Sequence, residues 1–99
     1  MTRAESERYF ASRARLSQIG AWASLQSTDI ENYQSLTHRL HEFEQKFAGQ
    51  EHIPCPENWG GYLLIPNEFE FWIGRNGRLH ERYVYRKHGS GWQRTMRSP

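Results

Sequence analysis

The sequence has little cysteine and no long apolar run, and each shortage excludes a class of protein. Among its 99 residues only Cys55 is a cysteine, so no intrachain disulfide can form and a reducing compartment is expected. No apolar stretch reaches the roughly 20 residues that span a bilayer. Residues 1–8 are polar and lack the apolar core of a signal peptide. We therefore expect a cytoplasmic protein with no membrane segment.

Basic charge is also scarce. The net charge is +2, the lysines are Lys46 and Lys87, and the arginines are scattered along the chain. A domain that binds nucleic acid usually concentrates its basic residues in a stripe. The sequence also lacks a glycine-rich phosphate loop and any Cys/His spacing typical of a metal site. These shortages argue against nucleic acid as a partner and predict no metal.

Aromatic residues are what the sequence has in quantity. They make up 14% of the chain and include four tryptophans and five phenylalanines. A chain of this length forms one small domain and buries only about 60–65% of its unfolded surface. So many large rings exceed what such a core normally encloses, which indicates burial against another chain. We therefore expect a single domain over residues 1–99 with a partner chain.

The clearest element is an amphipathic helix over about residues 28–48. Its apolar positions recur at spacings of three and four: Ile30, Tyr33, Leu36, Leu40, Phe43 and Phe47. Ser27, Thr28 and Asp29 are suitable N-cap residues, and Thr28 and Glu31 have capping-box spacing. Gly49 suits the position just after the helix.

Two segments precede this helix and a series of strands follows it. Residues 3–15 predict a short helix, whereas residues 17–26, with Gly20, indicate a close backbone approach or the start of a strand. After a loop at 50–60, the strands fall at about 61–96: Tyr62–Ile65 and Phe69–Ile73, Arg78–Arg86 after an Asn76-Gly77 hairpin, and Trp92–Met96. One amphipathic helix followed by an antiparallel β meander gives an α+β class.

Three cationic side chains share one face of the returning strand, because strand side chains alternate with a period of two. These are Arg78, His80 and Arg82. A bound phosphate or flavin would relieve their mutual repulsion, and so would solvent at a charged sheet edge. Glu68 and Glu70 alternate with aromatic residues and are interpreted as ordinary outward positions.

Two further patterns could bind an anion. Tyr9, Arg13 and Ser17 are spaced by four, so on a helix they share one face whose donors suit a phosphate group; a solvated helix face is the alternative. Gln26 and Ser27 come immediately before the amphipathic helix, whose N-terminal N–H groups attract anions; Ser27 as a simple N-cap is the alternative.

Three runs of the sequence resemble the C-terminal half of pyridoxine (pyridoxamine) 5′-phosphate oxidases. They are YFASRARLSQIGAWASLQS (9–27), IPCPENWGGY (53–62) and FEFWIGRNGRLHERYVY (69–85). The chain departs from the family pattern at Ala14 and Leu16, which replace a proline and an aspartate, at Leu63, which replaces an arginine, and at Met96-Arg97. None of these departures removes a site residue that the resemblance implies.

The resemblance implies the C-terminal part of an FMN-binding split-barrel fold and a role for each matching residue. The residues that would bind the substrate phosphate are Tyr9, Arg13 and Ser17. Those that would contact FMN are Gln26, Ser27, Trp72 and Arg82. Arg78 and His80 would contact the substrate near its reacting carbon, as the catalytic pair. From its sequence position alone, Trp72 is interpreted as a residue that packs in a core or an interface.

The activity implied is FMN-dependent oxidation of pyridoxine or pyridoxamine 5′-phosphate to pyridoxal 5′-phosphate, with O2 as acceptor. The family's enzymes are about twice as long as this chain and are dimers. We therefore expect a split or truncated subunit that needs an N-terminal half, in a homodimer or a complex with that half. The alternative is a remnant without catalytic activity that binds pyridoxal phosphate or mediates dimerisation.

Overall fold

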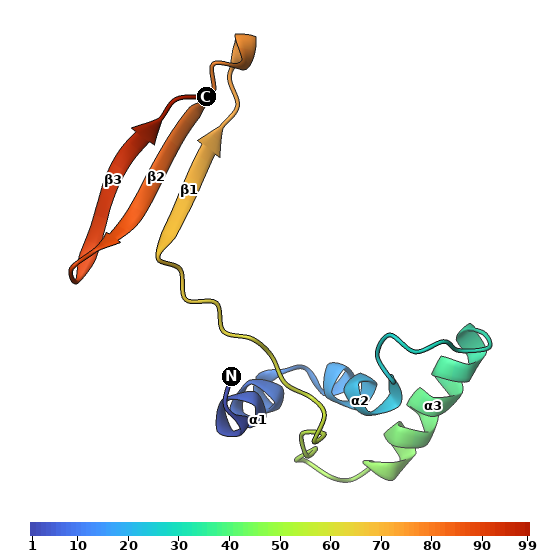
Figure 1. The fold of residues 1–99 in the computed structure, drawn as a ribbon. Helices are drawn as coiled ribbons and strands as arrows, with labels where there is room; N and C mark the ends of the chain where they lie inside the picture. Colours follow the sequence, from blue (N-terminus) through green and yellow to red (C-terminus); the bar gives the residue numbers. More distant parts are fainter. The chain divides into compact units, whose positions relative to one another are not determined.

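The computed structural model describes residues 1–99 and contains two compact units, residues 1–63 and 64–99 (Figure 1). The first unit holds three helices and the second a three-stranded antiparallel sheet. The α+β class is thereby confirmed, with one helix more than the two that the sequence predicts. The single domain over residues 1–99 stays a prediction.

None of the three helices combines the length and the apolar character needed to cross a membrane.

Helices α1 (Arg3–Ser12) and α2 (Arg15–Ala23) open the first unit. The Thr2 hydroxyl accepts from the backbone N–H of Glu5, whose carboxylate accepts from the N–H of Thr2, so a capping box starts α1.

The strand start or close approach expected over residues 17–26 is wrong, because most of this segment lies in α2. Ile19 and Ala23, four residues apart, are both buried on one helix face. A methyl group added at Gly20 would meet no atom within 4 Å, so no backbone lies close to it.

Helix α3 (Tyr33–Lys46) is the expected amphipathic helix, but it begins five residues later than predicted. Asn32 caps it, since its Oδ1 accepts from the backbone N–H of Ser35 at 2.9 Å. Thr28 cannot serve as the cap, because its hydroxyl donates to the carbonyl of Leu25 at 2.7 Å and closes a turn there. Gly49 lies beyond the end of the helix, with a φ of 78°.

A small core holds the first unit together. Phe10, Ile19, Phe47 and Ile53 are each no more than 5% exposed. Partly buried rings pack around them, namely Trp22, Phe43 and Trp59. The core therefore brings the loop after α3 against α1 and α2.

The second unit is a sheet of β1 (Glu68–Ile73), β2 (Glu81–His88) and β3 (Gly91–Arg97), in that order. The strand expected over residues 62–65 is wrong, since this segment pairs with no strand. The returning strand begins at Glu81 and not at Arg78, because a 3-10 turn, η1 (Asn76–Arg78), intervenes, with Gly77 at a φ of 67°. The expected hairpin is confirmed, with a longer connection.

The two faces of this sheet differ in chemistry. One face, called here the ionic face, carries Glu68, Glu70, Arg82, Arg86 and Arg97 over the buried Val84. The opposite face, called here the aromatic face, carries Phe69, Phe71, Tyr85 and Trp92, whose ring centroids lie 4.8–5.6 Å apart in contacting pairs. The sheet thus has one charged face and one aromatic face.

Candidate functional site

A cavity of about 470 Å³ in the first unit brings together three of the residues singled out in the sequence: Arg13, Ser17 and Gln26. Small residues of α2 and its C-cap line it at helical spacing: Ser17, Gly20, Ala21 and Ser24. The segment Asn58–Gly60 of the loop after α3 lines it as well. Arg13 is the one charged side chain of this lining, so the cavity suits an anionic group of small size.

Tyr9, Arg13 and Ser17 do not share one helix as expected. Arg13 follows α1 with extended backbone (ψ 153°), so Tyr9 and Ser17 lie on different helices. Arg13 and Ser17 both line the cavity, whereas Tyr9 does not and lies beside Trp59. Arg13 Nη1 donates to the carbonyl of Ser17 at 3.3 Å, and the Tyr9 ring lies 5.9 Å from the Trp59 ring, over which the Arg13 guanidinium also sits.

Gln26 and Ser27 do not lie at the N-terminus of a helix, so that expectation is wrong. They occupy the turn between α2 and α3, five residues or more before the cap at Asn32, and Ser27 has a φ of 64°. Gln26 nevertheless lines the cavity, whereas Ser27 does not. The helix dipole therefore contributes nothing at these two residues.

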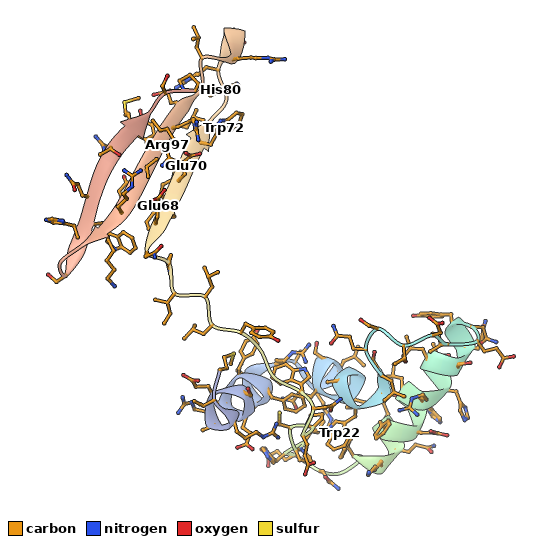
Figure 2. All side chains as sticks on the ribbon, in the orientation of Figure 1. Trp22, Glu68, Glu70, Trp72, His80 and Arg97 are labelled. Carbon is orange, nitrogen blue, oxygen red and sulfur yellow. The ribbon has the colours of Figure 1, made fainter.

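In the second unit, Trp72 and His80 form a ring pair with centroids 4.4 Å apart (Figure 2). Trp72 is 57% exposed. The backbone N–H of Arg75 donates to His80 Nδ1 at 3.0 Å, which places the proton of a neutral imidazole on Nε2. His80 can therefore offer an N–H donor to a ligand beside the Trp72 ring.

The three cations expected on one strand face do not share it. Arg78 belongs to η1, with a φ of 60°, and His80 precedes β2. Arg82 lies in β2 directly opposite Trp72 on β1. Of the three, Arg82 alone is on the ionic face of the sheet.

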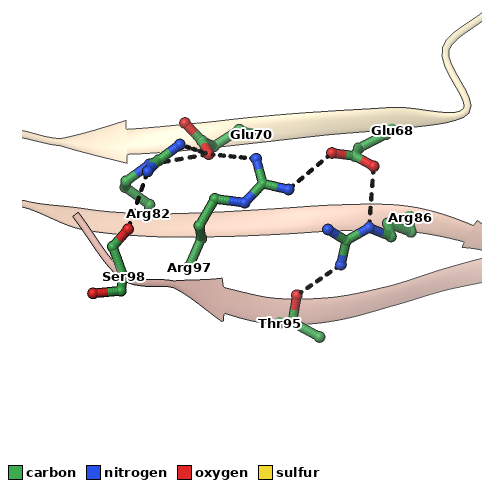
Figure 3. Close-up of polar contacts among 7 residues, drawn as sticks. All are labelled: Glu68, Glu70, Arg82, Arg86, Thr95, Arg97 and Ser98. Carbon is green, nitrogen blue, oxygen red and sulfur yellow. Dashed lines mark hydrogen bonds and ion pairs between the residues drawn. The ribbon is translucent and has the colours of Figure 1, made fainter.

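Arg82 is held in a ladder of ion pairs that crosses all three strands (Figure 3). Its Nε and Nη2 donate to Glu70 Oε1 at 3.1 and 2.9 Å, and its Nη1 donates to the carbonyl of Ser98 at 3.0 Å. Arg97 joins Glu70 to Glu68, which also accepts from Arg86. Hydrogen bonds from Arg97 and then Arg86 hold the pKa of Glu68 below its ordinary value. Glu68 and Glu70 therefore form ion pairs with the arginines, so their interpretation as ordinary outward positions is incomplete.

Trp59 and Asn58 line the cavity but have no role in the sequence-based interpretation. The signal for them was the WGGY run, which matched the family without indicating what the tryptophan does. Nowhere in the chain do three His, Cys, Asp or Glu side chains come together as ligands for a metal ion.

Comparison with solved structures defines the class of protein. The chain is similar over its full length to PhzG from Burkholderia lata, whose crystal structure contains tetrahydrophenazine-1-carboxylic acid, with a TM-score of 0.79 and 27% identity. The match covers 48% of that chain. The fold is therefore α+β and corresponds to the C-terminal part of a split barrel.

Sequence comparisons then give the family. A model for the pyridoxine 5′-phosphate oxidase C-terminal dimerisation region matches residues 59–99. A pyridoxine/pyridoxamine 5′-phosphate oxidase of Bdellovibrio bacteriovorus is 55% identical over 97% of this chain, and a pyridoxamine 5′-phosphate oxidase of Saccharomyces cerevisiae is 49% identical over 88%. The chain belongs to the pyridoxine 5′-phosphate oxidase family and matches its C-terminal half. It covers 49% and 38% of the length of these two relatives.

Proposed function

We propose that this chain supplies the substrate-phosphate pocket and part of the flavin site of an oxidase that converts pyridoxine or pyridoxamine 5′-phosphate to pyridoxal 5′-phosphate. The observation that carries the proposal is the cavity in which Arg13 and Ser17 meet, in a chain whose relatives bear the name of that activity. O2 is the proposed electron acceptor. The cytoplasm is the proposed location.

The phosphate of the substrate would bind in the first unit. Arg13 presents a guanidinium with a single hydrogen bond to protein, to the carbonyl of Ser17, so its other N–H groups are available to phosphate oxygens. The hydroxyls of Ser17 and the exposed Tyr9 would add neutral donors. Binding energy at this remote group would fix the position of the ring that reacts.

In the second unit, Trp72 and Arg82 would contact the flavin. Trp72 presents a largely exposed aromatic surface, and Arg82, directly opposite it, uses three of its five N–H groups on Glu70 and Ser98. A planar ring system with polar edges fits this pair. Gln26 and Ser27, which belong to the first unit, are proposed as further polar contacts to FMN. FMN, when bound, would supply the redox chemistry.

Arg78 and His80 would contact the substrate near its reacting carbon. Arg78 is exposed and makes no ion pair in the chain, so it is free to bind an anionic or polar substituent of the substrate. His80 would donate from Nε2 while the Arg75 N–H fixes the ring through Nδ1.

The test is turnover with and without the remainder of the enzyme. The chain is mixed with FMN and pyridoxine 5′-phosphate, alone or with the N-terminal half of the Bdellovibrio relative, and formation of pyridoxal 5′-phosphate is followed. We expect turnover only in the mixture of the two halves. Turnover by the chain alone would show that it needs no second half. No pyridoxal 5′-phosphate formation in either sample would contradict the proposed activity.

A second candidate is dimerisation without catalysis. The family model that matches residues 59–99 is described as a dimerisation region, and the aromatic face exposes Phe71 by 57% and Trp92 by 42%. A chain that forms a dimer but gives no turnover, alone or with the N-terminal half, would favour this function.

A further inference from the structure

We infer that Trp59 is a positioning residue that orients Arg13 for the substrate phosphate, and that Arg3 holds Trp59 in place. The inference rests on the proposed function, because it concerns the same phosphate pocket. It adds to that pocket two residues that would themselves donate no hydrogen bond to the phosphate.

Trp59 contacts both proposed phosphate ligands that precede α2. The Arg13 guanidinium carbon lies 5.2 Å from the centroid of the Trp59 ring, within the range of a cation–π contact. The Tyr9 ring lies 5.9 Å away and tilted by 34°. Without Trp59, only the hydrogen bond to Ser17 would restrain the long Arg13 side chain.

Two contacts hold Trp59 in place, one through its ring and one through its backbone. Its ring meets the edge of Phe10, a core residue that is 1% exposed, at 5.1 Å and an interplanar angle of 74°. Its backbone N–H donates to the carbonyl of Pro56 at 3.1 Å. The ring is thus anchored on the core independently of Arg13.

Arg3 on α1 binds the backbone of the loop that carries Trp59. Its Nη2 donates to the carbonyl of Cys55 at 2.8 Å, and its Nη1 donates to those of Pro56, Glu57 and Trp59 at 2.9, 3.4 and 3.3 Å. The planar fork of a guanidinium can reach several carbonyls at once, which an ammonium cannot do in the same geometry. Arg3 therefore joins α1 to the loop that carries the Trp59 ring.

The experiment measures the affinity for pyridoxal 5′-phosphate and for pyridoxal, which lacks the phosphate, in the chain combined with the N-terminal half of the Bdellovibrio relative. For Trp59→Leu we expect binding of the phosphate ester to weaken about fivefold to tenfold, the range that loss of a cation–π contact gives. Pyridoxal affinity should change by less than about twofold, because Arg13 acts on the phosphate alone. Trp59→Phe keeps a ring and should restore most of the affinity.

Two matched variants separate positioning from general damage. Trp22→Leu removes another tryptophan that packs on the same core but does not contact Arg13, and it should leave the ratio of the two affinities unchanged. Arg3→Lys should lower the ratio in the same direction as Trp59→Leu, whereas Glu7→Gln, which loses only the ion pair with Arg3, should not.

The outcomes distinguish this inference from the proposed function. If the wild-type complex bound pyridoxal 5′-phosphate no better than pyridoxal, the phosphate pocket would be wrong and the inference would fall with it. If the wild type favoured the ester and Trp59→Leu kept that preference in full, the pocket would stand and the positioning role of Trp59 would be wrong.

Discussion

At Arg13 the guanidinium touches the Trp59 ring and the Ser17 carbonyl, and no carboxylate neutralises it. An arginine that lines a cavity and has no ion-pair partner is the strongest single indication of an anion site in this chain. The ring contact and the bond to Ser17 orient the group without cancelling its charge.

Arg13→Ala should weaken binding of pyridoxal 5′-phosphate by about 10- to 100-fold, because a hydrogen-bonded charge contact to the phosphate is lost. Equilibrium titration of the complex between this chain and the N-terminal half of the Bdellovibrio relative, called here the two-half complex, would measure this affinity. Arg8→Ala, which removes an exposed arginine of α1 outside the cavity, is the matched control and should change the affinity little. Equal affinities for the two variants would remove Arg13 from the site.

Arg82→Leu should lower FMN retention about tenfold after gel filtration of the two-half complex, since a charge beside Trp72 is lost. Arg86→Leu is a close control, because it removes another arginine of the ladder four residues along β2. If both variants released FMN equally, the ladder as a whole and not Arg82 would govern retention. Full occupancy in Arg82→Leu would contradict a flavin contact.

Elements begin where a side chain satisfies their free N–H groups, and α3 illustrates this. Asn32→Ala should lower the free energy of unfolding by about 1 kcal/mol, since Ser35 loses its capping acceptor. Thr28→Ala should lower it by less than about 0.5 kcal/mol, because Thr28 only closes an exposed turn. Urea denaturation of both variants would measure the difference, and the reverse order would place the cap at Thr28.

The sheet should lose stability in acid, through Glu68 on the ionic face and Glu81 on the other face. The pKa of Glu68 is held below its ordinary value of 4.5 by Arg97 and Arg86, and that of Glu81 by the Tyr83 hydroxyl and Arg75. A carboxyl whose pKa is lower in the folded chain stabilises it at pH values above the unfolded pKa. This stabilisation is lost as the pH falls through the folded pKa.

The urea midpoint should therefore fall between about pH 5 and about pH 3, and less steeply in Glu68→Gln than in the wild type. Glu31→Gln, at a residue that forms no ion pair, should keep the wild-type slope. A slope in Glu68→Gln as steep as in the wild type would show that this carboxylate contributes no acid sensitivity.

Much of this architecture could be predicted from the sequence, and the failures have local causes. The 3.6-residue period located the amphipathic helix, and Asn76-Gly77 located the first hairpin. The period did not reveal which of Thr28 and Asn32 would cap the helix, because both residue types serve. Helix α2 was missed because small residues and Gly20 weaken its helical signal.

The site was harder to predict than the fold, because it depends on contacts between residues distant in sequence. Spacing by four placed Tyr9, Arg13 and Ser17 on one helix, and the break at Arg13 could not be seen in that spacing. Trp59 reaches Arg13 from 46 residues further along the chain, through packing on Phe10. Such a contact leaves no local pattern.

At the scale of the whole molecule, the aromatic face is the surface best suited to a partner chain. Phe71→Arg should shift the two-half complex from dimer to lower mass in sedimentation equilibrium, because a charge would be buried at an apolar contact. Gln93→Arg adds the same charge to the opposite face, opposite Arg86, and should leave the mass unchanged. An unchanged mass in both variants would exclude the aromatic face as the interface.

Val84 lies beneath the ladder with 0% of its surface exposed, although the sheet has only three strands. The aliphatic stems of the arginines beside it exclude water while their charged ends stay solvated. This face of the sheet is thus covered by its own side chains. The aromatic face, where Phe71 is 57% exposed, is therefore the side of the sheet that a further layer could cover.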